Sequence, residues 1–107
     1  MSLGSPGEIS DPMGDVELTR QLVLERLKGE SVQVWLFGSR VWGQPVRSSD
    51  IDVGILPLGE LRPTIFIELL EALEQSPIRP IVELFDLRRV DPALRRRVLD
   101  HGVPWKK

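Results

Sequence analysis

The chain has 107 residues, of which 41% are hydrophobic and 28% are charged, and its formal net charge is −2 at pH 7. These values are typical of one globular domain, exclude a chain that is disordered throughout, and disfavour nucleic acid as the main partner. The absence of cysteine and the single His101 exclude a disulfide framework, a thiolate metal site and histidine-rich zinc chemistry.

Residues 1–14 are rich in Gly, Ser and Pro and show no apolar period, which predicts a flexible leader or an expression remnant. They contain no apolar signal core after a basic start, and no apolar run in the chain approaches the roughly 18 residues that a membrane span needs. We therefore expect a single domain over residues 15–107, no membrane association, and a cytoplasmic location.

The first half of this domain reads as a helix followed by two strands. Apolar residues recur at helical spacing between Asp15, a candidate N-cap, and Gly29, a candidate stop, which predicts the first helix. Residues 31–37 are rich in β-branched and aromatic side chains and predict a strand buried on both faces. Residues 50–56 predict a second strand.

The second half adds a helix, a strand and a last helix. Residues 62–75 have apolar residues at helical spacing, and residues 81–87 follow two prolines and predict a strand. Asp91 before a proline predicts the start of the last helix, and Gly102 its end. The element order predicts an α/β (α+β) fold, in which helices pack on a small mixed β-sheet.

Asp50 and Asp52 are the first candidate site residues. Because side chains alternate along a strand, both carboxylates point to one face, with α-carbons about 6.5 Å apart. A lone Asp-x-Asp is usually a solvated pair, yet two like charges on an otherwise apolar strand repel unless a cation lies between them. Hard oxygen ligands of this kind favour Mg²⁺ or Mn²⁺, and a nucleotide triphosphate would complete the coordination.

Gly38 and Ser39 come directly after the first strand. A glycine there allows backbone N–H groups to approach a phosphate, and the serine hydroxyl can donate a hydrogen bond to it. Arg40 and Arg47 could add charge-assisted hydrogen bonds. These residues predict a phosphate-binding turn beside the carboxylates.

A third carboxylate would complete a site for two metal ions, and residues 81–87 offer Glu83 and Asp86. The two are three positions apart and therefore face opposite sides of the strand. Glu83 lies mid-strand, where an unpaired charge is costly, whereas Asp86 lies near the strand end, where turn or capping roles are common. We expect Glu83 to be the third ligand.

Three other features have ordinary structural interpretations. The five arginines at positions 88, 89, 95, 96 and 97 are expected to form a solvated face, with contact to phosphate or an acidic partner as the alternative. Trp42 is expected to pack in the core, with stacking on a base as the alternative. His101 precedes a helix end, where the helix dipole explains it without a catalytic role.

Gly38-Ser39, Gly43 and Ser49-Asp50-x-Asp52, in this order and spacing, resemble the signature of the polymerase-beta-type nucleotidyltransferase superfamily, particularly its minimal single-domain members. The resemblance implies a nucleotidyltransferase-like fold and two Mg²⁺ ions held by the paired aspartates and a later acidic residue, here Glu83. It implies a triphosphate held at the Gly-Ser turn, which makes Arg40, Gly43 and Ser49 nucleotide-binding candidates. It also implies a small helical HEPN-type partner, onto which some antitoxin members transfer AMP.

The chain departs from the family pattern at Glu83, where aspartate is usual, and at Val41, where a small residue is usual. The leading hypothesis is a magnesium-dependent nucleotidyltransferase that moves AMP from ATP to a hydroxyl acceptor. We expect no additional substrate-binding domain of the kind that larger relatives carry, so the acceptor would be bound through a partner or a homo-oligomer. The alternatives are a non-catalytic protein of the same fold that masks a helical partner, and a nucleotide sensor without turnover.

Overall fold

The computed structural model describes residues 12–43 and 49–107 of the chain. In chain order its helices and strands are α2 (Pro12–Arg26), β1 (Val32–Phe37), α3 (Ser39–Trp42), β2 (Ile51–Pro57), α4 (Ile65–Glu74), β3 (Val82–Asp86), α5 (Pro92–His101) and β4 (Val103–Lys106). The strands form one mixed sheet in the order β3-β2-β1-β4, in which β2 and β3 are parallel and the other neighbours are antiparallel. The predicted α/β class with a small mixed sheet is confirmed.

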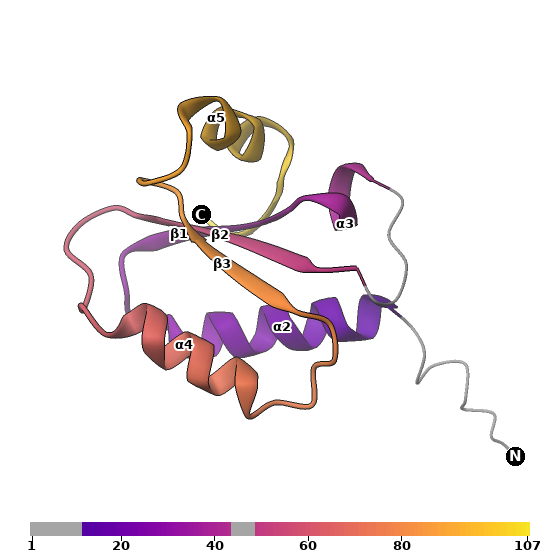
Figure 1. The fold of residues 1–107 in the computed structure, drawn as a ribbon. Helices are drawn as coiled ribbons and strands as arrows, with labels where there is room; N and C mark the ends of the chain where they lie inside the picture. The colour runs from indigo at the N-terminus through magenta and orange to yellow at the C-terminus, as the bar shows by residue number, and fades with distance from the viewer. Residues whose placement is uncertain (1–11, 44–48) are drawn as a thin grey trace, which may run out of the picture.

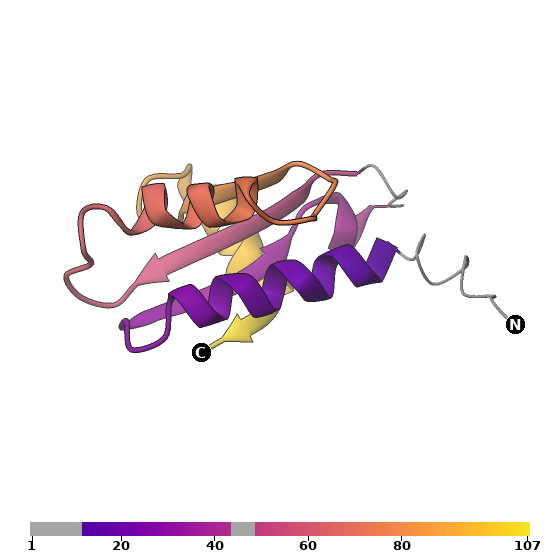
Figure 2. The same cartoon turned by 90° about the horizontal axis from the view of Figure 1, so that it is seen from below.

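The helices cover the sheet from both sides. Helices α2 and α4 lie on one face, and α5 lies on the other (Figure 1). Seen from below, α2 and α4 run side by side under the strands (Figure 2). No helix in the part of the chain that the structure describes is long and apolar enough to cross a membrane.

The main core lies between the sheet and the α2–α4 layer. Ile51, Val53 and Ile55 of β2 are fully buried there, as their alternation predicts. A second, smaller cluster lies under α5 and contains Trp35, Phe37, Leu87 and Val98. The face of β2 that carries Asp52 therefore also carries apolar packing, and the site occupies one end of that face.

The predicted helix and strand boundaries hold in most places, with two corrections at the start of the domain. Helix α2 begins at Pro12, so residues 12–14, which were assigned to the leader, are helical. Asp15 lies in the first turn of α2 instead of capping it. Residues 1–11 lie outside the described part of the chain.

Two elements were not predicted. The short helix α3 follows Gly38, and β4 pairs antiparallel with β1 at the sheet edge. Strand β4 contains Pro104, which an edge strand tolerates because one side of its backbone needs no partner. Gly102 does end α5, but by close packing: its φ is −73°, and a Cβ there would lie 2.6 Å from the carbonyl oxygen of Val98.

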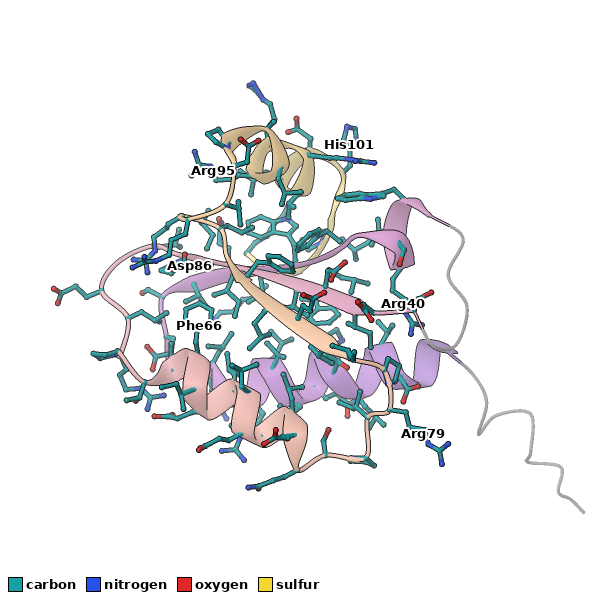
Figure 3. The ribbon with its side chains drawn as sticks, viewed as in Figure 1. Arg40, Phe66, Arg79, Asp86, Arg95 and His101 are labelled. Carbon is teal, nitrogen blue, oxygen red and sulfur yellow. The ribbon has the colours of Figure 1, made fainter. Side chains whose placement is uncertain are left out.

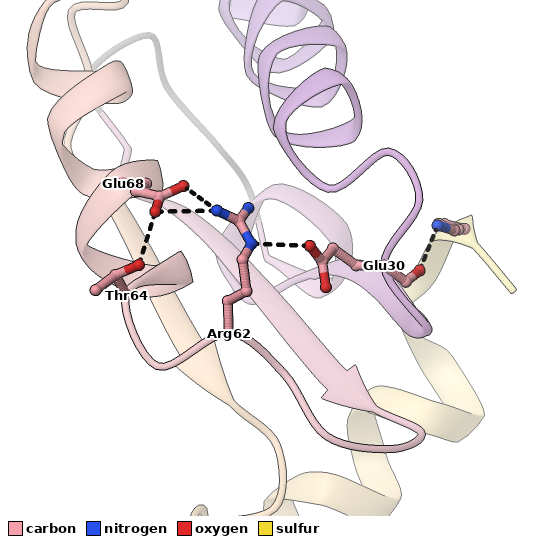
Figure 4. Close-up of polar contacts among 5 residues, drawn as sticks. Glu30, Arg62, Thr64 and Glu68 are labelled. Atoms are coloured by element: carbon pink, nitrogen blue, oxygen red, sulfur yellow. Dashed lines mark hydrogen bonds and ion pairs between the residues drawn. The ribbon is translucent and has the colours of Figure 1, made fainter.

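Arg62 ties the loop before α4 to the turn after α2 (Figure 4). Its guanidinium donates to Glu30 at 3.1 Å and to Glu68 at 2.9 Å, and the hydroxyl of Thr64 also donates to Glu68. These contacts are exposed, so they orient the start of α4 more than they stabilise the fold.

Candidate functional site

Strand register brings Asp52 and Glu83 together. In the antiparallel β1–β2 pair Asp52 lies opposite Phe37, and in the parallel β2–β3 pair it lies opposite Glu83. Neighbouring residues at one register position share a face of the sheet. Register therefore places Glu83 beside Asp52. Asp86, three residues later in the same strand, points to the opposite face.

The three predicted carboxylates interact electrostatically. The pKa of Asp52 is raised, first because its side chain is half-buried and then because Glu83 and Asp50 add negative charge nearby. Asp50 is exposed and lies one residue before β2, so it approaches from the end of the strand. A cation near Asp52 would favour its ionised form and would therefore lower this pKa again.

The carboxylates are neighbours, but they are not gathered around one point. Within residues 12–43 and 49–107, no group of three or more His, Asp or Glu side chains lies close enough together to hold a metal ion. Glu83 is exposed, because β3 is an edge strand. Glu83 was predicted as the third ligand because an unpaired buried charge is costly, and this reason was wrong because the side chain is exposed. Strand register is what places Glu83 beside Asp52.

Gly38 lies directly against Asp52. Its φ of 84° and ψ of −155° belong to a region that is essentially restricted to glycine. A Cβ at residue 38 would overlap the Oδ2 atom of Asp52 and lie 3.0 Å from its Cγ. Backbone conformation and close approach therefore both require glycine at this position.

Gly38, Ser39 and Gly43 form one tight turn around α3. The carbonyl oxygen of Gly38 accepts hydrogen bonds from the N–H groups of Val41 at 2.9 Å and Trp42 at 3.0 Å. The N–H of Gly43 donates to Ser39 at 3.1 Å, and a Cβ at residue 43 would lie 3.0 Å from the Cα of Ser39. The exposed Ser39 begins the helix, one residue beyond the glycine that touches Asp52.

Residues 23–104 match the family model described as polymerase beta, nucleotidyltransferase. The chain belongs to this nucleotidyltransferase family. No curated protein sequence is significantly similar to it.

Several solved structures share the fold of this nucleotidyltransferase. A toxin-antitoxin structure with AMP-PNP is 28% identical with a TM-score of 0.62, and the match covers 80% of this chain and 71% of that chain. A mutant of the toxin-antitoxin MntA-HpeT is 28% identical with a TM-score of 0.57, covering 82% and 68%. A tri-AMPylated Shewanella oneidensis HEPN toxin in complex with MNT antitoxin gives 24% identity and a TM-score of 0.60, covering 89% and 71%.

Arg40 and Ser49 of the nucleotidyltransferase lie together. The Nε and Nη2 atoms of Arg40 donate to the backbone oxygen of Ser49 at 3.2 and 2.6 Å. Arg40 therefore links α3 to the residue that precedes Asp50, at the opposite end of the sheet from Asp86 (Figure 3). The predicted phosphate contact Arg47 lies outside the described residues.

Asp86 has the turn role that was predicted for it. Its carboxylate accepts hydrogen bonds from the backbone N–H of Arg88 at 3.0 Å and from the guanidinium of Arg88 at 2.9 Å. The side-chain bond from Arg88 is the main reason that the pKa of Asp86 is lowered, and Arg89, at 3.5 Å, adds to it.

The arginines of α5 also have structural contacts. Arg95 donates to the backbone oxygen of Leu87 at 3.3 Å, and the guanidinium of Arg97 lies 4.1 Å from the centre of the Trp42 ring. Trp42 packs against the cluster under α5, which supports the packing interpretation over base stacking. The Trp42–Arg97 contact joins distant parts of the chain and has no signal in the sequence.

Proposed function

We propose that this nucleotidyltransferase transfers AMP from ATP to a hydroxyl group on a small helical HEPN-type partner, in a magnesium-dependent reaction. The observation that carries the proposal is the position of Asp52, which lies opposite Glu83 in the sheet, is influenced by the charges of Glu83 and Asp50, and lies against Gly38. The arrangement supports the proposal because carboxylates and a glycine turn lie at one end of the sheet, and carboxylates are the groups that would hold two metal ions in nucleotidyl transfer.

Asp50, Asp52 and Glu83 are the proposed ligands for two Mg²⁺ ions, and Mn²⁺ could replace them. Their fit rests on the donor set, because carboxylate oxygens suit these ions. The pKa of Asp52 is raised first by burial and then by the negative charges of Glu83 and Asp50, and a cation would oppose both effects. When bound, the ions would activate the acceptor oxygen and neutralise charge on the departing pyrophosphate. The bound ions would also require the three side chains to draw closer together than they are in this structure.

The reaction balances as a substitution at the α-phosphorus of ATP. The acceptor oxygen forms a bond to this phosphorus, the bond from the α-phosphorus to the oxygen that bridges to the β-phosphorus breaks, and pyrophosphate leaves. Glu83, the proposed base nearest the acceptor oxygen, would take the acceptor proton and then pass it to water. The turn of Gly38, Ser39 and Gly43 would hold the triphosphate, with Arg40 and Ser49 at its edge.

The partner is proposed from the solved relatives. Structures at 28% identity are a toxin-antitoxin with AMP-PNP and a mutant MntA-HpeT toxin-antitoxin pair. A small helical toxin that carries the acceptor hydroxyl would supply the acceptor-binding surface, and a homo-oligomer is the other arrangement that could do so. We place the reaction in the cytoplasm, in line with the sequence expectation.

Labelled ATP tests the proposal. The protein, Mg²⁺ and a small helical HEPN-type protein are incubated with ATP labelled at either the α- or the γ-phosphate. We expect label on the partner only from α-labelled ATP, because pyrophosphate carries the γ-label away. Asp50→Ala and Asp52→Ala should abolish transfer, whereas Asp100→Ala, on the exposed face of α5, should retain it.

The labelling experiment, together with measurements of complex formation, nucleotide binding and pyrophosphate release, separates the alternatives. Unchanged labelling with Asp52→Ala would contradict the mechanism. A complex with the partner that forms without any metal-dependent nucleotide binding would indicate a masking protein, and ATP binding without release of pyrophosphate would indicate a sensor.

A further inference from the structure

Helix α3 depends on contacts with the rest of the protein. It has only four residues, and none of them is fully buried. A helix of this length is not stable by itself, because the cost of forming the first turn is not recovered by further hydrogen bonds. Its position matters because its N-cap, Gly38, lies directly against Asp52.

Three side chains of α3 attach it in three directions. Arg40 donates to the backbone oxygen of Ser49 and so holds the helix to the entrance of β2. Val41 packs against the core between the sheet and the α2–α4 layer. Trp42 packs on the opposite side, against the cluster under α5.

The Trp42 attachment continues through an aromatic row. Its ring lies 5.9 Å from the ring of Phe37, and Phe37 makes an edge contact with Phe85 at 5.1 Å. Phe37 is also the residue opposite Asp52 in the β1–β2 register. The row therefore runs from α3 across the same sheet face that carries the carboxylates.

Arg97 closes this row from α5. Its guanidinium carbon lies 4.1 Å from the centre of the Trp42 ring, well within the range of a cation–π interaction, and Trp is the strongest of the aromatic acceptors. Its neighbour Arg96 lines a separate hollow with Pro92, Arg95, Leu99 and Asp100. The two arginines have the same charge and adjacent positions, but among the described residues only Arg97 lies over the ring.

We infer that Arg97 is a positioning residue, which acts through Trp42 to hold the Gly38–Ser39 turn in the geometry that binds the triphosphate. Arg97 needs no contact with the nucleotide to act in this way. The part of the inference that concerns triphosphate binding rests on the proposed function. The structural part of it, that Arg97 orders α3, can be tested whether or not the protein transfers AMP.

The first experiment measures the order of α3 directly. Amide hydrogen exchange of Val41, Trp42 and Gly43 is followed by NMR in wild type, Arg97→Ala and Arg96→Ala, at a temperature where each variant is folded. Arg97 is exposed, and we expect exchange in Arg97→Ala to be about two- to fivefold faster, the range that a cation–π contact at an exposed site allows. Arg96→Ala should match the wild type, and Arg97→Lys should recover part of the protection.

The second experiment measures nucleotide binding with Mg²⁺ and α,β-methylene-ATP, in which the bond that would break is replaced. The Kd should rise by about the same factor in Arg97→Ala and should not change in Arg96→Ala. In a Trp42→Leu background, Arg97→Ala should have little further effect, because the contact is already lost. A role of Arg97 in global stability alone would leave the Kd of the folded protein unchanged.

Each result has a defined meaning. Unchanged exchange at α3 in Arg97→Ala overturns the inference. Tighter nucleotide binding in Arg97→Ala also overturns it, because a base would then compete with Arg97 for the Trp42 ring. Faster exchange in a protein whose wild type binds no nucleotide contradicts the proposed function and leaves the anchoring of α3 by Arg97 standing.

Discussion

Asp52 and Gly38 are in such close contact that a methyl group at residue 38 would overlap the Asp52 carboxylate. The contact joins the end of β1 to the centre of the candidate site. It follows from the register that places Asp52 opposite Phe37, the residue before Gly38.

Gly38→Ala should therefore be more damaging than glycine substitution at another positive φ. The backbone conformation alone costs about 1–3 kcal/mol for a residue other than glycine. The collision with Asp52 adds to this, and we expect a lower free energy of unfolding in urea and loss of AMP transfer. Gly29→Ala is the matched control, because Gly29 has a φ of 86° and a Cβ added there would meet nothing within 4 Å.

The combination with Asp52→Ala isolates the collision. If the overlap with the carboxylate is real, Gly38→Ala should cost less stability in the Asp52→Ala background than in the wild type. An equal cost in both backgrounds would show that backbone conformation explains the whole effect.

Asp52→Asn should stabilise the protein when no metal is present. Because the pKa of Asp52 is raised in the folded state, folding loses stability as the pH rises from the ordinary value of about 3.9 through the folded pKa. The variant should gain about 0.5–1 kcal/mol at pH 7 in EDTA, reduced by solvent screening, and no advantage at low pH. Urea unfolding at both pH values measures this, with Asp100→Asn as the control.

Magnesium and nucleotide should make the wild type more stable than Asp52→Asn, which is the reverse of the order expected in EDTA. They should raise the Tm of the wild type and have little effect on Asp52→Asn, which lacks a proposed ligand. A variant that responds as strongly as the wild type would argue against Asp52 as a ligand.

Asp86→Asn should destabilise the protein near neutral pH without affecting nucleotide binding. The hydrogen bonds from Arg88 lower the pKa of Asp86, so its stabilisation is present above the ordinary pKa and is lost as the pH falls through the folded pKa. We expect a loss of about 0.5–1 kcal/mol at pH 7 that shrinks below about pH 4. A constant difference across this range would contradict an ionic role for Asp86.

Gly54→Ala should disturb the packing under α5. A Cβ at residue 54 would lie 3.0 Å from the side chain of Leu87, which is fully buried. Overpacking of this kind costs about 1–3 kcal/mol, and replacing Leu87 by Val in the same chain should recover part of it. Gly59→Ala, where nothing lies within 4 Å, is the control for the unfolding measurement.

Local patterns in the sequence were sufficient for much of the fold. The last helix begins as predicted, with the carboxylate of Asp91 accepting a hydrogen bond from the N–H of Ala93 at 3.0 Å. The alternation in β2 placed Ile51, Val53 and Ile55 in the core, because successive side chains of a strand point to opposite faces. Such features depend only on residues close together in the chain.

The sequence by itself determined the glycine turn, the Asp-x-Asp spacing and the family signature that they form. Tertiary structure alone decided that β4 completes the sheet, that Glu83 lies beside Asp52, and that Arg97 covers the Trp42 ring. These three relationships join segments that are distant in the chain. Strand register and the packing of α5 set them, and no local period or propensity records either one.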